Sequence, residues 1–233
     1  MRLTHRAALA CATAAAAFAV VLVPTSPALA ESNGGVRVMP LGDSITDGFN
    51  VPGGYRTRLW ERAAADRRRT DFVGSQFNGP AQLGDHDHEG HSGWRIDQID
   101  AQATQWVRAT NPRTVLLHIG TNDITQNRDI PGAPSRLSAL IDHITAAAPG
   151  ADVFVTNIIP FSDATFEARA RPFNAAVPGI VDQWAKKGRK VHFVDMHSAL
   201  NTGDLADGIH PNAGGYAKMA DRWYATLRTG PWI

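Results

Sequence analysis

Residues 36–48 read Val-Arg-Val-Met-Pro-Leu-Gly-Asp-Ser-Ile-Thr-Asp-Gly, a short and mostly apolar run that passes into a Gly-Asp-Ser turn. A run of this length, rich in valine and bounded by glycine, predicts a strand inside a covered parallel sheet. We expect that strand at residues 36–40, with Ser44 just beyond its carboxyl end. Ligands bind beyond the carboxyl ends of the strands in open α/β sheets. The residues that follow each strand are therefore the first candidates for a functional site.

The rest of the chain alternates between two patterns. Four further segments share the composition of the first strand and are expected to be strands: residues 71–73, 114–119, 153–159 and 191–194. Between them, apolar residues recur at the spacing of one helix face, as in residues 96–107, 137–144 and 216–227. Strands that alternate with helices predict an α/β protein. The expected architecture is a three-layer α/β/α sandwich with a central five-stranded parallel sheet.

A side-chain amide follows the third expected strand. Residues 120–123 read Gly-Thr-Asn-Asp, which places Asn122 beyond the end of the strand at 114–119. An amide in that position can donate a hydrogen bond to negative charge that develops during a reaction. Taken alone, the segment is equally explained as an Asn-Asp turn with local backbone bonds, as is the Gly-Asp-Ser segment.

An acidic residue and a histidine follow the last expected strand. Residues 207–211 read Asp-Gly-Ile-His-Pro. Pro211 fits the first position of the final helix and holds His210 in an extended backbone conformation. Asp207 can turn to bind one imidazole nitrogen, which sets the tautomer and leaves the other nitrogen free to accept a proton. A helix cap would explain Asp207 but would leave His210 without a function.

The three motifs together resemble the SGNH hydrolases, also called the GDSL family. The family's first block is matched at residues 42–44, its third at 120–123 and its fifth, Asp-x-x-His, at 207–210. The resemblance implies the flavodoxin-like SGNH hydrolase fold and a serine esterase that needs no cofactor. Ser44 is then the nucleophile, His210 the base and Asp207 the residue that orients it. The Gly-x-Ser-x-Gly elbow of α/β-hydrolases does not fit the serine of this chain.

The resemblance also implies an oxyanion hole made of the backbone N–H of Ser44, the N–H of a second-block glycine and the side-chain amide of Asn122. The second block corresponds to residues 89–95, which read Glu-Gly-His-Ser-Gly-Trp-Arg. We assign its glycine to Gly90. Gly93 is the alternative, because the two glycines lie close together in the sequence.

Residues 85–91, Asp-His-Asp-His-Glu-Gly-His, also have the composition of a metal site. His86, His88 and His91 with the neighbouring carboxylates could in principle bind zinc. We interpret the segment as a polar loop around Gly90, because the serine triad already supplies a nucleophile, and we predict no metal.

Around the blocks, the sequence is similar to the third family of carbohydrate esterases. The resembling stretches are residues 39–48, 53–56 and 89–96. That resemblance implies an acetylxylan esterase or a related carbohydrate deacetylase acting on an acetylated polysaccharide or a small ester. Its pocket is expected to involve Asp47, Tyr55, His91 and Trp94. The alternatives are a lipase, lysophospholipase or acyl thioesterase of the same superfamily, and an inactive carbohydrate-binding protein. The last would have a broken triad, whereas every expected residue is present.

The first thirty residues have the pattern of a secretory signal peptide. A basic start with Arg2 and Arg6 precedes the apolar residues 7–23, and Ala-Leu-Ala at 28–30 predicts cleavage after Ala30. A membrane anchor is the rival interpretation, but the apolar run is short for one. We therefore expect a secreted, extracellular protein with one SGNH hydrolase domain at residues 31–233.

Removal of the leader changes the composition of the mature chain. Cys11, the one cysteine of the sequence, lies in the leader, so neither a disulfide nor a cysteine nucleophile is expected. Without Arg2 and Arg6, the 23 basic residues become 21 against 22 acidic ones, a net charge of −1. This balance gives no reason to expect nucleic acid or an anionic membrane as a partner, and the sequence predicts no oligomeric state.

Overall fold

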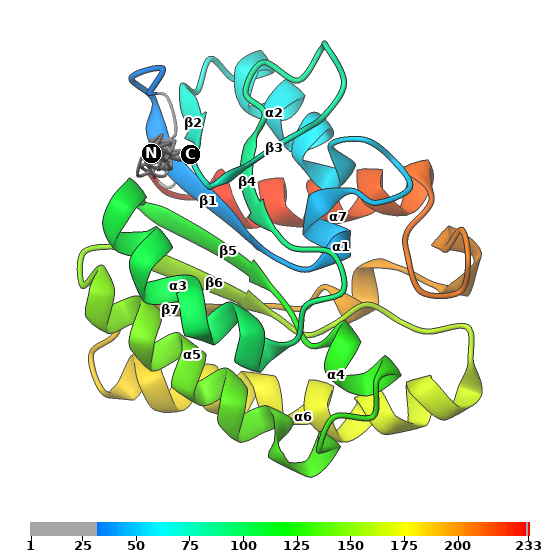
Figure 1. Ribbon diagram of the computed structural model, residues 1–233. Coiled ribbons are helices and arrows are strands. Elements are labelled where there is room, and N and C mark those ends of the chain that lie inside the picture. The colour runs from blue at the N-terminus through cyan, green and yellow to red at the C-terminus, as the bar shows by residue number, and fades with distance from the viewer. Residues whose placement is uncertain (1–31, 232) are drawn as a thin grey trace, which may run out of the picture.

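The computed structural model describes residues 32–231 and 233, so the expected leader, its cleavage site and Cys11 lie outside the described residues. Seven strands form one sheet in the order β3-β4-β1-β5-β6-β7, with β2 paired to β1 (Figure 1). The strands are β1 (Val36–Gly42), β2 (Thr70–Phe72), β3 (Gln76–Phe77), β4 (Asp87–Gly90), β5 (Thr114–His118), β6 (Asp152–Thr156) and β7 (Val191–Val194).

The α/β class and the parallel central sheet are confirmed, but the expected count of five strands is wrong. The five expected strands correspond to β1, β2, β5, β6 and β7, and all of these pair in parallel. The two additional strands are β4, which pairs in parallel with β1, and β3, which is antiparallel to β4. Strand β4 is buried along its whole length although it reads Asp-His-Glu-Gly. Its polar sequence conceals it from a search for apolar runs.

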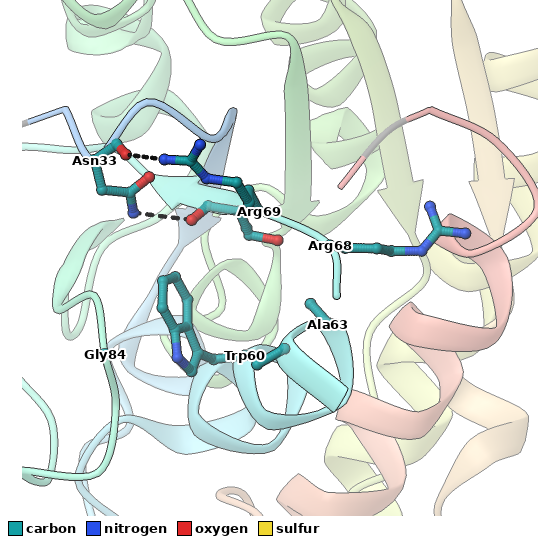
Figure 2. Close-up of a pocket in the computed structure, with 8 residues that line it drawn as sticks. Asn33, Trp60, Ala63, Arg68, Arg69 and Gly84 are labelled. Carbon is teal, nitrogen blue, oxygen red and sulfur yellow. Dashed lines mark hydrogen bonds between the residues drawn. The ribbon is translucent and has the colours of Figure 1, made fainter. Parts of the chain in front are cut away.

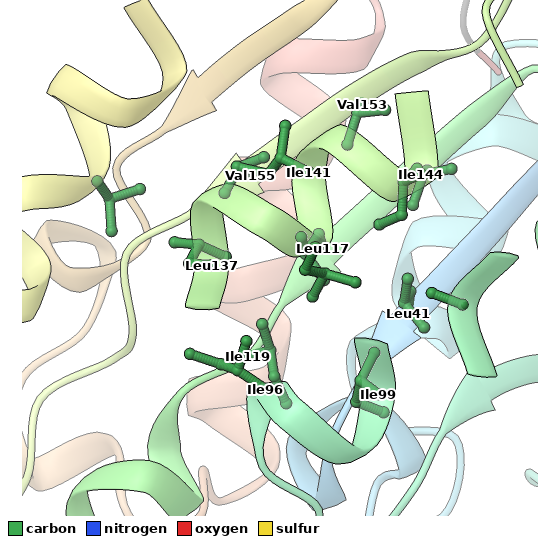
Figure 3. Close-up of a cluster of buried hydrophobic side chains, with 14 of the residues drawn as sticks. Leu41, Ile96, Ile99, Leu117, Ile119, Leu137, Ile141, Ile144, Val153 and Val155 are labelled. Carbon is green, nitrogen blue, oxygen red and sulfur yellow. The ribbon is translucent and has the colours of Figure 1, made fainter. Parts of the chain in front are cut away.

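Helices cover both faces of the sheet (Figure 1). Helices α3 (Ile96–Thr110), α5 (Ala133–Ala147) and α6 (Ala164–Lys186) share one apolar core with the sheet, part of which is shown in Figure 3. Helices α2 (Gly54–Ala65) and α7 (Ala213–Leu227) pack on the other face, together with Ile45 of the short helix α1 (Ser44–Asp47). The remaining helical turns are α4 (Thr121–Thr125), η1 (Ile130–Gly132), η2 (His197–Ala199) and η3 (Thr202–Asp204).

The central strands are apolar throughout because both of their faces are covered. Along β5, Val115 and Leu117 enter the core beneath α3 and α5, whereas Leu116 enters the core beneath α2 and α7. Full burial of an aliphatic side chain stabilises the fold by about 1.5–3 kcal/mol. None of the described helices is long and apolar enough to cross a membrane.

The final helix begins two residues later than expected. Asn212 caps it by accepting a hydrogen bond from the Gly215 N–H at 2.9 Å. Pro211 instead pairs with Leu205 in an isolated antiparallel bridge that closes the loop before the helix. Asparagine is one of the strongest helix caps, so the helix begins after Asn212 rather than at Pro211. His210 consequently lies in the loop, at the carboxyl edge of the sheet.

Candidate active site

The structure brings Ser44, His210 and Asp207 together. The Nε2 atom of His210 lies 2.9 Å from the Oγ atom of Ser44, and its Nδ1 atom lies 2.7 Å from Oδ2 of Asp207. Asp207 also accepts hydrogen bonds from the backbone N–H groups of Ile209 and His210. Partial burial opposes the charge on Asp207, but these bonds outweigh it and hold the pKa of that carboxyl below its usual range. A carboxylate is therefore available to orient the imidazole.

The loop of His210 is shaped by a glycine and remains open to solvent. Gly208 has a φ of 85°, in the left-handed region that favours glycine. Its carbonyl accepts a hydrogen bond from the Ser162 N–H at 2.9 Å. The side chain of Asp207 is 47% exposed and that of His210 is 16% exposed. The triad therefore lies at an open edge rather than in a closed cavity.

The backbone around Ser44 is held by buried polar groups. Asp43 caps α1 by accepting the Ile45 N–H at 3.0 Å, and its complete burial raises the pKa of the carboxyl to about 7. Arg56, also fully buried, donates to the carbonyl oxygens of Thr46 and His86. These bonds tie the end of α1 to the segment that precedes β4.

The two second-block glycines have different surroundings. Gly90 is buried in β4, and its N–H donates to Nδ1 of His88 at 3.0 Å. Gly93 lies in an exposed turn that is closed by the Trp94 N–H and the His91 carbonyl, with a φ of 81°. A turn of this kind does not use the N–H groups of its two central residues. The turn therefore leaves the N–H groups of Ser92 and Gly93 available at this edge, whereas that of Gly90 is already bonded.

Asn122 lies directly against this turn. Asn122 is the second residue of the short helix α4, which begins after Gly120, a glycine with a φ of 123°. Its Nδ2 atom donates to the Trp94 carbonyl at 3.0 Å, while Gln126 donates to the Gly93 carbonyl at 2.9 Å. A side-chain amide has two N–H groups. One group of Asn122 holds the turn, and the other can serve as a donor to substrate.

The four expected pocket residues separate into two groups. Asp47 accepts a hydrogen bond from Ser92 at 2.6 Å, and the ring of His91 stacks on Trp94 with a centroid distance of 4.5 Å. These three residues surround the turn. Tyr55, in contrast, is fully buried, and its hydroxyl lies 3.3 Å from that of Thr46. Its expected place in the pocket is therefore corrected: Tyr55 supports α1 from the core side of α2.

The three histidines of residues 85–91 have separate partners. His88 accepts the Gly90 N–H, and burial lowers the pKa of its ring to about 2. His91 is bonded to Glu89 at 2.6 Å, and His86 stacks under Phe77. Within residues 32–231 and 233, no three side chains of the types that bind metals converge on one point.

Sequence reasoning missed Phe49. It follows α1, is 64% exposed and lies against His210 with a ring-centroid distance of 5.1 Å. Phe49 belongs to no periodic apolar pattern, so neither helix nor strand spacing predicts a role for it. The sequence feature that could have identified Phe49 is its position, because it is a large apolar residue that comes just after the turn of the nucleophile.

A cavity of about 310 Å³ lies elsewhere in the molecule (Figure 2). It is lined by Asn33 before β1, Thr70 at the start of β2, Trp60 of α2 and Gly84 between β3 and β4, together with residues at the end of α2 and in the segment after it. Because β1 and β2 start there, this cavity is at the opposite end of the sheet from Ser44. It is not part of the site.

Among the known proteins that this chain is similar to are esterases and acylhydrolases. The sequence profile of the GDSL-like Lipase/Acylhydrolase family matches residues 41–218. A family 3 carbohydrate esterase from Clostridium thermocellum is 38% identical, with a TM-score of 0.74 over 82% of this chain and 94% of that one. A carbohydrate esterase family 3 structure from Talaromyces cellulolyticus is 33% identical, with a TM-score of 0.72 over 83% and 97% of the two chains.

A longer protein that is similar to this chain is also named as an esterase. The multidomain esterase of Ruminococcus flavefaciens is 31% identical over 87% of this chain. The chain spans only 30% of the length of that protein.

Proposed function

The chain belongs to the GDSL-like lipase/acylhydrolase family, and we propose that it is a secreted serine esterase that removes acetyl groups from xylan or a related polysaccharide. The array of Ser44, His210 and Asp207 carries the proposal, with 2.9 Å from Oγ to Nε2 and 2.7 Å from Nδ1 to Oδ2. A hydroxyl, an imidazole and a carboxylate at these distances form the arrangement that activates serine for acyl transfer.

In the proposed reaction, the Ser44 oxygen attacks the ester carbonyl while His210 takes the hydroxyl proton at Nε2. Asp207 keeps the other ring proton at Nδ1 and stabilises the imidazolium. The bond between the acetyl carbon and the sugar oxygen then breaks, and that oxygen receives the proton from His210 and leaves as a sugar hydroxyl. Water then attacks the acetyl carbonyl while His210 takes one of its protons. The second tetrahedral intermediate expels the Ser44 oxygen, which receives that proton from His210, and acetate leaves.

The oxyanion of both intermediates needs donors at the same edge. The N–H of Ser44 opens α1, where a backbone N–H has no partner inside the helix. We assign the second donor to Gly93 instead of Gly90, because the Gly90 N–H is bonded to His88. The third donor is the free N–H of the Asn122 amide. Such preorganised donors usually provide the largest single contribution to catalysis.

The choice of substrate has three supports. The two family 3 carbohydrate esterases are more than 30% identical to this chain. A third structure at 33% identity is an acetyl esterase with an acetate ion. The open position of the triad suits a polymer chain that must pass across the surface, and a leader at residues 1–30 would deliver the enzyme to such a polymer outside the cell. N-terminal sequencing of the protein from culture medium is expected to begin at Glu31.

The test is a series of aryl esters from acetyl to octanoyl, run beside acetylated xylan. We expect activity to fall steeply from acetyl to butyryl, and acetate to be released from xylan. A preference for octanoyl or longer esters without acetate release would place the protein with the lipases and thioesterases. Binding of xylan without turnover of any ester would instead indicate an inactive carbohydrate-binding protein.

A further inference from the structure

Two large apolar side chains stand out as exposed among the described residues, Phe49 at 64% and Phe77 at 70%. Single exposed apolar residues are common and need no explanation by themselves. Phe77 is of that kind, since it lies on the edge strand β3 and stacks on His86 at 4.9 Å. Phe49 differs because the ring it touches is that of His210.

The backbone holds Phe49 in this place. Its N–H donates to the Ser44 carbonyl at 3.1 Å, so it is attached to the same turn as the nucleophile. The preceding residue, Gly48, is buried with a φ of 83°, and a Cβ there would lie 2.5 Å from the Gly54 nitrogen. A side chain at residue 48 would therefore collide with the start of α2, so the turn is packed closely against that helix. Phe49 is presented to solvent by this closely packed turn.

We propose that Phe49 is the sugar-binding platform of this site, on which the apolar face of the pyranose that carries the acetyl group stacks. The inference rests on the proposed function and names the residue that holds the sugar. One face of a pyranose is lined with C–H groups, and its stacking on an aromatic ring removes apolar surface of both from water. His210 returns a proton to the departing sugar oxygen, so a sugar on the neighbouring ring keeps that oxygen near the imidazole.

Other aromatic residues near the site are less suited to this role. Tyr55 is fully buried. Trp94 stacks on His91 at 4.5 Å, and the other stacking partner of His91 is Trp106 at 4.6 Å. These contacts give Trp94 a structural use in holding the turn. Phe49 makes its ring contact with His210 and keeps most of its surface available.

The experiment compares Phe49→Ala, Phe49→Tyr and the matched control Phe77→Ala on two substrates. Acetylated xylo-oligosaccharides can stack on the ring, whereas ethyl acetate has no ring to stack. Phe49→Ala is expected to raise KM for the oligosaccharides about threefold to tenfold and to leave kcat/KM for ethyl acetate within about twofold. Phe49→Tyr keeps the ring and should behave like the wild type, as should Phe77→Ala. Thermal melts of the variants establish that all are folded.

Three results would overturn the inference. Equal losses on both substrates would mean that Phe49 acts through His210, and no loss on either would mean that it has no part in binding. In both cases the wild type still releases acetate from the oligosaccharides, so the proposed function stands. If the wild type cleaves ethyl acetate but releases none from the oligosaccharides, the proposed substrate and the platform fail together.

Discussion

His210 Nε2 lies 2.9 Å from Ser44 Oγ, although 166 positions separate the two residues in the sequence. Ser44 begins α1 directly after β1, and His210 lies in the loop that precedes α7. The two segments meet because α7 packs against α2, the helix that follows the nucleophile turn. A contact with this geometry permits proton transfer from the hydroxyl to the imidazole.

Asp207→Asn is expected to lower kcat for 4-nitrophenyl acetate by about 10³–10⁴-fold with little change in KM. An amide can present an N–H to Nδ1, which favours the tautomer whose Nε2 carries the proton and cannot accept one from Ser44. The control is Asp182→Asn, which removes an exposed carboxylate paired with Lys186. Activity of the Asp207 variant within tenfold of the wild type would show that the carboxylate does not orient the base.

Asn122→Ala is expected to reduce kcat by about 10²–10³-fold, because it removes a donor to the oxyanion. Gln126→Ala is the matched control. Both amides donate to carbonyls of the same turn, at 3.0 Å from Asn122 and 2.9 Å from Gln126. Steady-state kinetics of the two variants separate the roles. Losses of equal size, or an effect confined to KM, would assign Asn122 to support of the turn alone.

The edge of the sheet that carries the site could be predicted from sequence. The motifs that contain Ser44 and Asn122 follow β1 and β5, and parallel strands bring their carboxyl ends to one edge. The resemblance to the GDSL family is confirmed by the match over residues 41–218. The roles assigned to Ser44, Asp207 and His210 remain predictions, which the geometry now makes specific.

The remainder of the site depends on contacts that local patterns do not encode. Strand β4 is polar but buried, because Glu89 finds partners in Ser75 and His91. Tyr55 follows the nucleophile motif closely, yet it faces inward on α2 and packs against Trp223 at 6.2 Å. The polar sequence of β4 suggested an exposed loop, and the position of Tyr55 shortly after Ser44 suggested a pocket residue. Only the tertiary arrangement determines which side chains face solvent.

The buried carboxyl of Asp43 is expected to make stability depend on pH. Burial raises its pKa to about 7 in the folded protein, whereas an unfolded aspartate has a pKa of about 3.9. Between these values the folded state holds a proton that the unfolded state has lost, so this group's contribution to stability falls as pH rises. In Asp43→Asn the side chain stays neutral and its oxygen can still accept the Ile45 N–H.

Thermal melts of the wild type and Asp43→Asn between pH 4.5 and 7.5 check this expectation. The melting temperature of the variant should rise relative to that of the wild type as pH increases. Two parallel curves would show that the folded and unfolded states have the same pKa at Asp43.

The most direct test of the central claim is the turnover of 4-nitrophenyl acetate by Ser44→Ala. The substitution removes the hydroxyl beside His210 and leaves the rest of the site in place, so its thermal melt should match that of the wild type. The account predicts a fall in kcat on the order of 10³-fold or more. Activity close to that of the wild type in a folded Ser44→Ala protein would contradict it, because ester cleavage would then proceed without the proposed nucleophile.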